Sequence, residues 1–211
     1  MNWKLLSVLS RLNIGLAFGE RTISDVCRMQ GINLDSFFLI CNAYTYDDYV
    51  PSSELLSGAE PLAIVEYLHN SHSFYLDKEF PALESNIKAM TEPCEPVQQK
   101  IVGRFFGDYK TQVQKHFAYE EKVVFPYVRS LVAGETSQGY SIEKFEENHS
   151  NIDETLNDLK NIVMKYIPDT CDMVLRNEVL YGIFRLEEDL KKHTLIEDRV
   201  LIPMVNRMEE K

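Results

Sequence analysis

The chain has 211 residues, of which 45% are hydrophobic and 26% charged, so its composition is that of an ordered globular protein with a sizeable core. Its 33 acidic residues outnumber its 22 basic residues and give a formal net charge of -11, which disfavours nucleic acids and anionic membrane surfaces because both require positive charge on the protein. No apolar stretch approaches the roughly 18–20 residues needed to span a bilayer, so we expect no nucleic-acid and no membrane partner.

Residues 1–50 predict a small N-terminal helical module. Short apolar patterns with helical spacing are separated there by turn signals. Thr22 and Ser24 are candidate N-caps of a helix that Gly31 closes. The polar, proline-containing stretch 51–60 is expected to be a linker.

The remainder of the chain, residues 61–211, shows helical periodicity in four long segments separated by short connections. Short connections favour antiparallel neighbours. The sequence therefore predicts an all-α fold, an up-down-up-down four-helix bundle preceded by the small helical module. The four expected helices span about residues 61–90, 97–131, 141–168 and 171–208.

All five histidines fall on the apolar stripes that are expected to face the core of this bundle. In the fourth segment, the stripe passes through Leu190, His193 and Glu197 at steps of three or four residues. The second segment places His116 and Glu120 in the same way. The other histidines, on the stripes of the first and third segments, are His69, His72 and His149.

The second and fourth segments also repeat one motif. Residues His116–Pro126 and His193–Pro203 both have the form H-x-x-x-E-acid-base-V-apolar-apolar-P. The spacing of four residues puts each imidazole and carboxylate about 6 Å apart on one helix face, where the histidine can bind one ion while the glutamate bridges two.

Two interpretations of these buried residues compete. A core histidine usually has only a hydrogen-bonding role, and two Glu–His pairs can neutralise each other as salt bridges. Salt bridges do not account for the histidines on the first and third segments, so we favour a metal site. Imidazole and carboxylate donors without a thiolate motif suit iron, manganese or zinc, and their number suits two ions bridged by carboxylates. The order His-x-x-x-Glu differs from the ferritin-type Glu-x-x-His and from the zincin motif HExxH.

The paired motif, with Glu147-Asn148-His149 between its two copies, resembles the hemerythrin-like (HHE cation-binding) family over about residues 60–205. The resemblance implies two non-haem iron ions joined by an oxygen or carboxylate bridge, with Glu120 and Glu197 as the bridging carboxylates; manganese and zinc stay open as alternatives. The implied ligands are His72, His116, Glu120, His149, His193 and Glu197, with His69 as an additional candidate.

Within this family, an additional N-terminal helical module resembles the iron-sulfur cluster repair (repair of iron centres) proteins. Those proteins carry adjacent cysteines followed by glycines, whereas this chain has Ala17-Phe18-Gly19-Glu20 at the corresponding place. The resemblance implies repair of damaged iron-sulfur proteins or a response to nitrosative or oxidative stress. Binding of O₂ or NO as a carrier or sensor is the main alternative. Oxidation chemistry at the two irons is a third, so enzymatic activity is left open, as is the oligomeric state.

The cysteines and the start of the chain favour the cytoplasm. Cys27, Cys41, Cys94 and Cys171 are far apart in the sequence and form no CxxC pair, which fits a reducing compartment better than a disulfide framework. Arg11 follows the short apolar start too soon for a signal peptide. We therefore expect a cytoplasmic protein.

Overall fold

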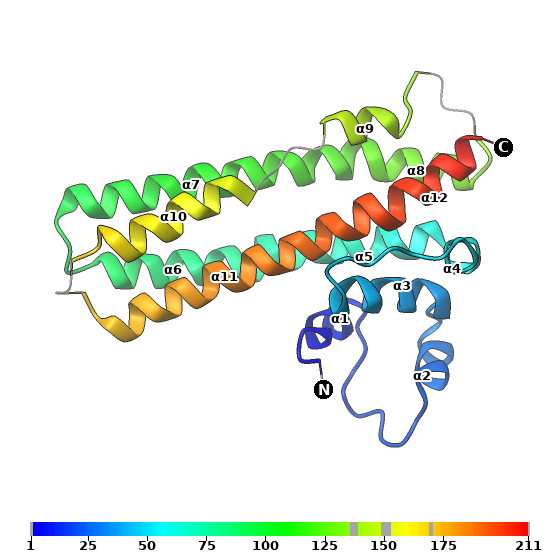
Figure 1. Ribbon diagram of the computed structural model, residues 1–211, viewed down its shortest axis with the longest axis horizontal. Coiled ribbons are helices and arrows are strands. Elements are labelled where there is room, and N and C mark those ends of the chain that lie inside the picture. Colours follow the sequence, from blue (N-terminus) through cyan, green and yellow to red (C-terminus); the bar gives the residue numbers. More distant parts are fainter. Residues whose placement is uncertain (1, 136–138, 149–152, 169–170, 211) are drawn as a thin grey trace. The chain divides into compact units, whose positions relative to one another are not determined.

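The computed structural model describes residues 2–135, 139–148, 153–168 and 171–210, and every regular element within these ranges is a helix (Figure 1). The chain forms two compact units that each collect several separate segments. Unit 1 contains Met1–Ser71, Glu120–His149 and Lys192–Lys211, and unit 2 contains His72–Tyr119 and Ser150–Lys191.

The N-terminal helices of unit 1 begin and end at residues that satisfy their terminal backbone groups. The Thr22 hydroxyl accepts a hydrogen bond from the amide of Asp25, and Gly31 ends the same helix in the left-handed conformation with φ 68°. Thr22 and Gly31 thus act as the sequence predicts. Asn33 caps the next helix by accepting from the amide of Ser36. These helices are α1 (Leu5–Arg11), α2 (Ile23–Gln30) and α3 (Leu34–Thr45).

The stretch expected to be a linker contains the short helix α4 (Ser53–Gly58). Ser52 caps it by accepting a hydrogen bond from the amide of Leu55, and Leu56 is buried. A short capped helix with one buried leucine carries too little periodicity to be recognised in a polar segment. The proposed division into a module, a linker and a bundle remains a prediction.

A buried arginine joins α1 to the helix α5 (Pro61–Phe74) inside unit 1. The Arg11 guanidinium donates to the hydroxyl oxygens of Tyr44, Tyr67 and Ser71, and the backbone carbonyl of Arg11 accepts from the side-chain amide of Asn70. These bonds satisfy a charged group that is costly to bury without polar partners. They therefore fix α1 and α3 against α5.

The C-terminal helix of unit 1 is tied to the segments around it by Glu209. Its carboxylate accepts hydrogen bonds from the hydroxyl of Tyr127 and from the amide of Ile142. Burial and this carboxylate raise the pKa of Tyr127 to about 12. The elements concerned are α8 (Phe125–Val132), α9 (Glu143–Asn148) and α12 (Ile202–Glu209).

Unit 2 is a bundle of antiparallel helices (Figure 1). Helices α6 and α10 run towards the end where the α6–α7 turn and the start of α11 lie, and α7 and α11 run away from it. Helix α7 packs against both α6 and α10. The buried core of unit 2 includes Phe106, Val113, Leu159 and Ile183. The helices are α6 (Phe80–Thr91), α7 (Pro96–Tyr119), α10 (Asp153–Lys165) and α11 (Met173–Ile196), the last belonging to unit 2 as far as Lys191.

Three of the long helices contain a π turn, and a proline follows each turn after one residue. A proline inside an α-helix lacks an N–H donor, and its ring clashes with the carbonyl four residues earlier. The wider π turn moves that carbonyl away, so the helix continues through the proline. The turns are η1 (Tyr75–Glu79) before Pro81, η2 (Glu120–Val124) before Pro126 and η3 (Glu197–Leu201) before Pro203.

The prediction of an all-α helical bundle is confirmed. The expected first, second and fourth helices correspond to α5–η1–α6, α7–η2–α8 and α11–η3–α12, with ends within about two residues. The expected third helix appears as α9 and α10, and residues 149–152 between them lie outside the described part.

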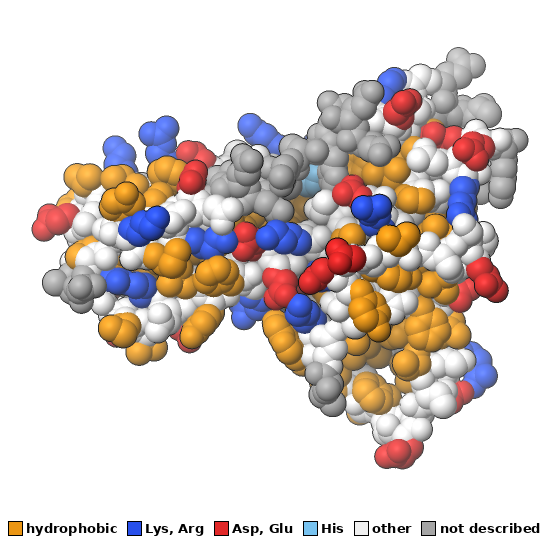
Figure 2. Space-filling model, viewed as in Figure 1, with side chains coloured by type: hydrophobic (Ala, Val, Ile, Leu, Met, Phe, Trp, Pro, Cys, Tyr) orange, Lys and Arg blue, Asp and Glu red, His pale blue; other side chains and the backbone are white. Residues whose placement is uncertain are grey.

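The described helices and the surface charge in Figure 2 bear on the expected absence of a membrane or nucleic-acid partner. Within the described ranges, no helix has the length and apolar character needed to cross a bilayer. On the face in Figure 2, acidic and basic side chains are interspersed, so the excess of acidic residues is not gathered in one place there.

A buried ion pair links α10 to α11 in unit 2. The Lys160 ammonium lies 2.8 Å from a carboxylate oxygen of Glu187, and the two side chains are only 10% and 11% exposed. Lys191 reaches the other carboxylate oxygen at 3.4 Å but is half exposed. Burial alone would raise the pKa of Glu187, but the hydrogen bonds and charges of the two lysines lower it below its ordinary value.

We expect Lys160→Met to lower the free energy of unfolding by about 2–3 kcal/mol at pH 7, because it leaves the Glu187 carboxylate buried without its main partner. Since the folded-state pKa of Glu187 is depressed, the stabilisation is present above the unfolded pKa and is lost as pH falls through the folded pKa. Urea titrations at pH 7 and at about pH 3 test this: the difference from wild type should shrink at the lower pH.

Lys191→Met, the exposed control, should lower the free energy of unfolding by less than about 1 kcal/mol. Equal losses in both variants would contradict the assignment.

Candidate metal centre

Two glutamates of unit 1 occupy equivalent places in their helices. Glu120 is the first residue of η2 and Glu197 is the first residue of η3. His193 lies one helical turn before Glu197, near the end of α11. The repeated motif thus places each carboxylate at the start of a π turn, where the helix widens.

These three side chains converge in the interior of unit 1. His193 Nε2 lies 3.1 Å from Glu197 Oε1 and 3.9 Å from Glu120 Oε2. One ligand atom from each of the three lies within 4.8 Å of the others. The exposed fractions of Glu120, His193 and Glu197 are 0%, 1% and 0%. We call these three residues the carboxylate–imidazole cluster.

The electrostatics of this cluster favour a bound cation. Burial alone would lower the pKa of His193, but the neighbouring Glu197 and Glu120 carboxylates raise it to about 9. When ionised, the two carboxylates carry two negative charges against the single positive charge of an imidazolium. The cluster offers one imidazole nitrogen and four carboxylate oxygens, a donor set that suits iron, manganese or zinc. Its residues therefore fit a divalent metal ion.

The histidines of unit 2 lie around one phenylalanine. His72, near the end of α5, is buried, and its ring stacks on Phe117 with centroids 4.1 Å apart. The His116 ring lies 5.9 Å from the Phe117 ring and is only partly buried. His72, His116 and Phe117 all belong to unit 2, so these ring contacts lie within that unit.

The expectation that His69 faces the core is wrong. Its ring nitrogen Nδ1 pairs with a Glu121 oxygen at 2.9 Å, and its side chain is 48% exposed. The buried face of α5 is centred on Leu68, Ser71 and His72. Residues three apart on a helix differ by about 60° in direction, so spacing alone could not show that His69 lies at the edge of this face.

One predicted ligand, His149, lies outside the described residues. The sequence reasoning also overlooked the π turns that begin at Glu120 and Glu197. Their signal was present, because a proline six residues after each glutamate cannot be accommodated in a regular α-helix without rearrangement.

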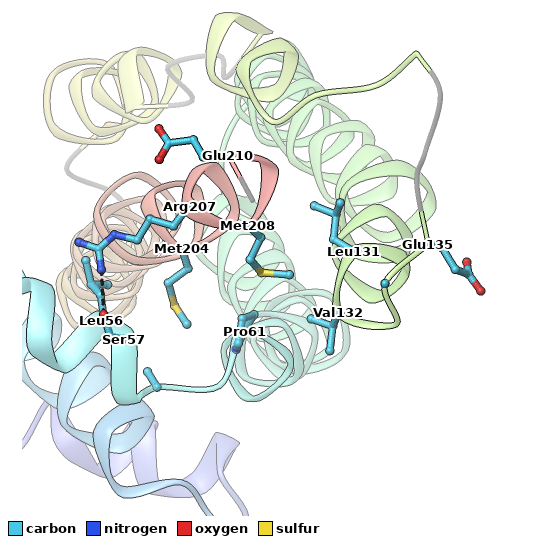
Figure 3. Close-up of a pocket in the computed structure, with 12 residues that line it drawn as sticks. Leu56, Ser57, Pro61, Leu131, Val132, Glu135, Met204, Arg207, Met208 and Glu210 are labelled. Carbon is cyan, nitrogen blue, oxygen red and sulfur yellow. Dashed lines mark hydrogen bonds between the residues drawn. The ribbon is translucent and has the colours of Figure 1, made fainter.

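A groove of about 940 Å³ in unit 1 is chemically different from the cluster (Figure 3). It lies between α4, the start of α5 and the ends of α8 and α12, and Leu56, Leu131, Met204 and Met208 contribute to its lining. The Arg207 guanidinium at its side donates to the Ser57 hydroxyl. The described lining holds no histidine, so the groove does not have the donor set of a metal site.

Comparison with known proteins shows the family of this chain. Residues 63–205, more than half of the chain, match the family model described as the hemerythrin HHE cation binding domain. No curated protein matches the sequence significantly. The matched range contains the carboxylate–imidazole cluster and both copies of the H-x-x-x-E motif. The chain therefore belongs to the hemerythrin HHE cation-binding domain family.

Proposed function

We propose that this protein binds two non-haem iron ions and that the carboxylate–imidazole cluster provides part of their coordination. The observation that supports this most is the convergence of two fully buried carboxylates and a buried imidazole within one unit. Glu120 and Glu197 are proposed as the bridging carboxylates. The full proposed ligand set is His72, His116, Glu120, His149, His193 and Glu197.

The number of donors supports two ions rather than one. A single divalent ion with an open position needs about three protein ligands. Six residues, two of which can bridge through both oxygens, suit a pair of ions in the core of a helical bundle. Iron is proposed because the family is typically di-iron, and manganese and zinc use the same donor types.

We further propose a role in repairing damaged iron-sulfur centres or in the response to nitrosative or oxidative stress. Support comes from the additional N-terminal helices, α1–α3, which precede the matched family range. The lack of a cysteine pair at residues 17–20 means that iron delivery through such thiols is not part of the proposal. Damaged iron-sulfur proteins are the proposed partners.

Binding of O₂ or NO without repair is the second candidate function, and burial favours it. Glu120, His193 and Glu197 are at most 1% exposed, so a diatomic molecule can reach such a centre more easily than a group held on another protein. When bound, iron would supply the coordination position and the redox chemistry for such a ligand. The protein residues would hold the ions and exclude water.

One experiment separates these roles. Protein purified without air is analysed for metal content and its ultraviolet–visible spectrum is recorded before and after O₂ or NO is added. The same sample is then mixed with an iron-sulfur enzyme whose cluster has been damaged. Recovery of that enzyme's activity supports repair, whereas a reversible spectral change without recovery supports carriage or sensing. Absence of bound metal would refute both roles.

We expect Glu120→Ala and Glu197→Ala each to lose at least one of the two ions, because each removes a proposed bridge. The matched controls are Glu121→Ala and Asp198→Ala, which remove the adjacent acidic side chains. Metal analysis after gel filtration measures the effect, and both controls should keep the wild-type content. Two tightly bound ions in both glutamate variants would exclude bridging.

Two histidines of α5 provide a second matched pair. His72→Ala should lower metal content and change the spectrum, because the buried imidazole is a proposed ligand. His69→Ala should leave both unchanged, because His69 is exposed and paired with Glu121. A changed spectrum in His69→Ala together with a normal one in His72→Ala would reverse the assignment of the two residues.

Removing the metal should lower the melting temperature by about 5–10 °C, since a ligand at about 100 times its Kd adds roughly 2.7 kcal/mol to stability. The cluster is assembled only in the folded chain, so metal binding and folding are coupled. Differential scanning calorimetry before and after chelation gives the shift, and readdition of Fe²⁺ without air should restore the original value. In Glu120→Ala the shift should be smaller; an unchanged melting temperature in wild type would contradict a buried site.

A further inference from the structure

Two cysteines that are far apart in the sequence meet inside unit 2. Cys94 lies in the turn between α6 and α7, and Cys171 lies two residues before α11. Their sulfur atoms are 2.6 Å apart although 77 positions separate the residues. Figure 1 shows the α6–α7 turn and the start of α11 at the same end of the unit 2 helices.

The separation of the two sulfurs is suited to bond formation. A disulfide bond is about 2.05 Å long, so a shift of about half an ångström would bring the sulfurs to bonding distance. Cys94 and Cys171 are only 6% and 4% exposed, so each faces the other thiol rather than solvent. Both are thiols in the structure.

Hydrogen bonds hold Cys94 and Cys171 in place. The Cys94 amide donates to the carbonyl of Thr91, and the Cys94 carbonyl accepts from the Gln99 side chain. The Cys171 amide donates to the carbonyl of Pro168, which also accepts from the Arg176 guanidinium. The contact between the sulfurs therefore joins two residues whose positions are held by hydrogen bonds.

The surroundings of the pair determine how quickly it can react. Burial, followed by the hydrogen bond and charge of Cys171, raises the pKa of the Cys94 thiol to about 11, although the Arg176 charge lowers it. Thiol–disulfide exchange requires the thiolate, so the folded protein should exchange slowly in both directions. Oxidation is expected to be fastest while the chain is folding, before the two cysteines are buried.

We propose that Cys94 and Cys171 are a redox modification site that forms a reversible disulfide and locks the starts of α7 and α11 together. These are the helices that carry His116 and His193 and lead into Glu120 and Glu197. Formation of the disulfide does not depend on the proposed iron centre. Only its effect on the helices that carry proposed metal ligands rests on the proposed function.

Oxidised glutathione, a small-molecule disulfide, is the oxidant. One cysteine loses its proton, and the thiolate attacks the glutathione disulfide, which forms a mixed disulfide and releases one glutathione thiolate. The second cysteine, also deprotonated, attacks the protein sulfur of that mixed disulfide and releases the second glutathione. Two protein thiols lose two electrons and two protons, and one oxidised glutathione becomes two molecules of glutathione.

The test uses the full-length, metal-free chain, so that its outcome is independent of iron binding. Wild type is unfolded in urea with reductant, refolded in a buffer of oxidised and reduced glutathione, quenched with acid, alkylated while denatured and digested for mass spectrometry. We expect a peptide that joins Cys94 to Cys171 in wild type and in the control Cys27→Ser, whose cysteine lies in unit 1. Cys94→Ala and Cys171→Ala should lack this peptide.

Oxidation should also raise the melting temperature of wild type by about 5–15 °C, as expected for a disulfide that closes a long loop in a chain of this size. Reductant should reverse the shift, and Cys94→Ala should show none.

The proposal would be overturned if Cys94 and Cys171 are found alkylated in wild type that has refolded to its native circular dichroism spectrum. Glutathione adducts without the joined peptide would also overturn it. A joined peptide without a change in melting temperature would overturn the locking role. Because wild type alone gives these results, poor folding of an alanine variant does not prevent the test.

Discussion

The burial of two carboxylates beside one imidazole is the constraint on which unit 1 depends. Moving an ionised carboxylate from water into an apolar interior costs several kcal/mol unless positive charge compensates it. Glu120 and Glu197 are both fully buried. An imidazolium at His193 supplies one positive charge to the cluster, as a structural salt bridge would. A divalent cation balances both charges and also uses the convergent oxygen and nitrogen donors, so metal binding accounts for more of the geometry.

The prolines that end the repeated motif shape the backbone at these carboxylates. Pro126 and Pro203 each require a wider turn before them, and that turn begins at the glutamate in both helices. The first long helix shows that the turn and the donor are separable. There Pro81 follows a π turn whose first residue, Tyr75, is buried and carries no carboxylate. The proline therefore indicates the backbone geometry, and the residue at the start of the turn decides the chemistry.

The cluster of Glu120, His193 and Glu197 was predictable because two helical stripes and one repeated motif specify the same inward positions. The extents of the long helices followed from the same periodicity. The exposure of His69 did not follow, because a difference of about 60° around α5 decides between core and surface and depends on which neighbours pack there. The contact between Cys94 and Cys171 depends on how the α6–α7 turn meets the start of α11, and no local pattern encodes that meeting.

The N-terminal helices contact the C-terminal helices of unit 1. Lys192, next to His193, has a side chain that is only 5% exposed, and its ammonium lies 2.7 Å from the carboxylate of Asp47, which follows α3. On α12, the Arg207 guanidinium donates to the backbone and side chain of Ser53 in α4. Both contacts fix the N-terminal segment to the helix that carries His193 and to its continuation. His193 lies directly after the Lys192 contact and is buried, whereas His116, at the same place in the repeated motif, is only partly buried.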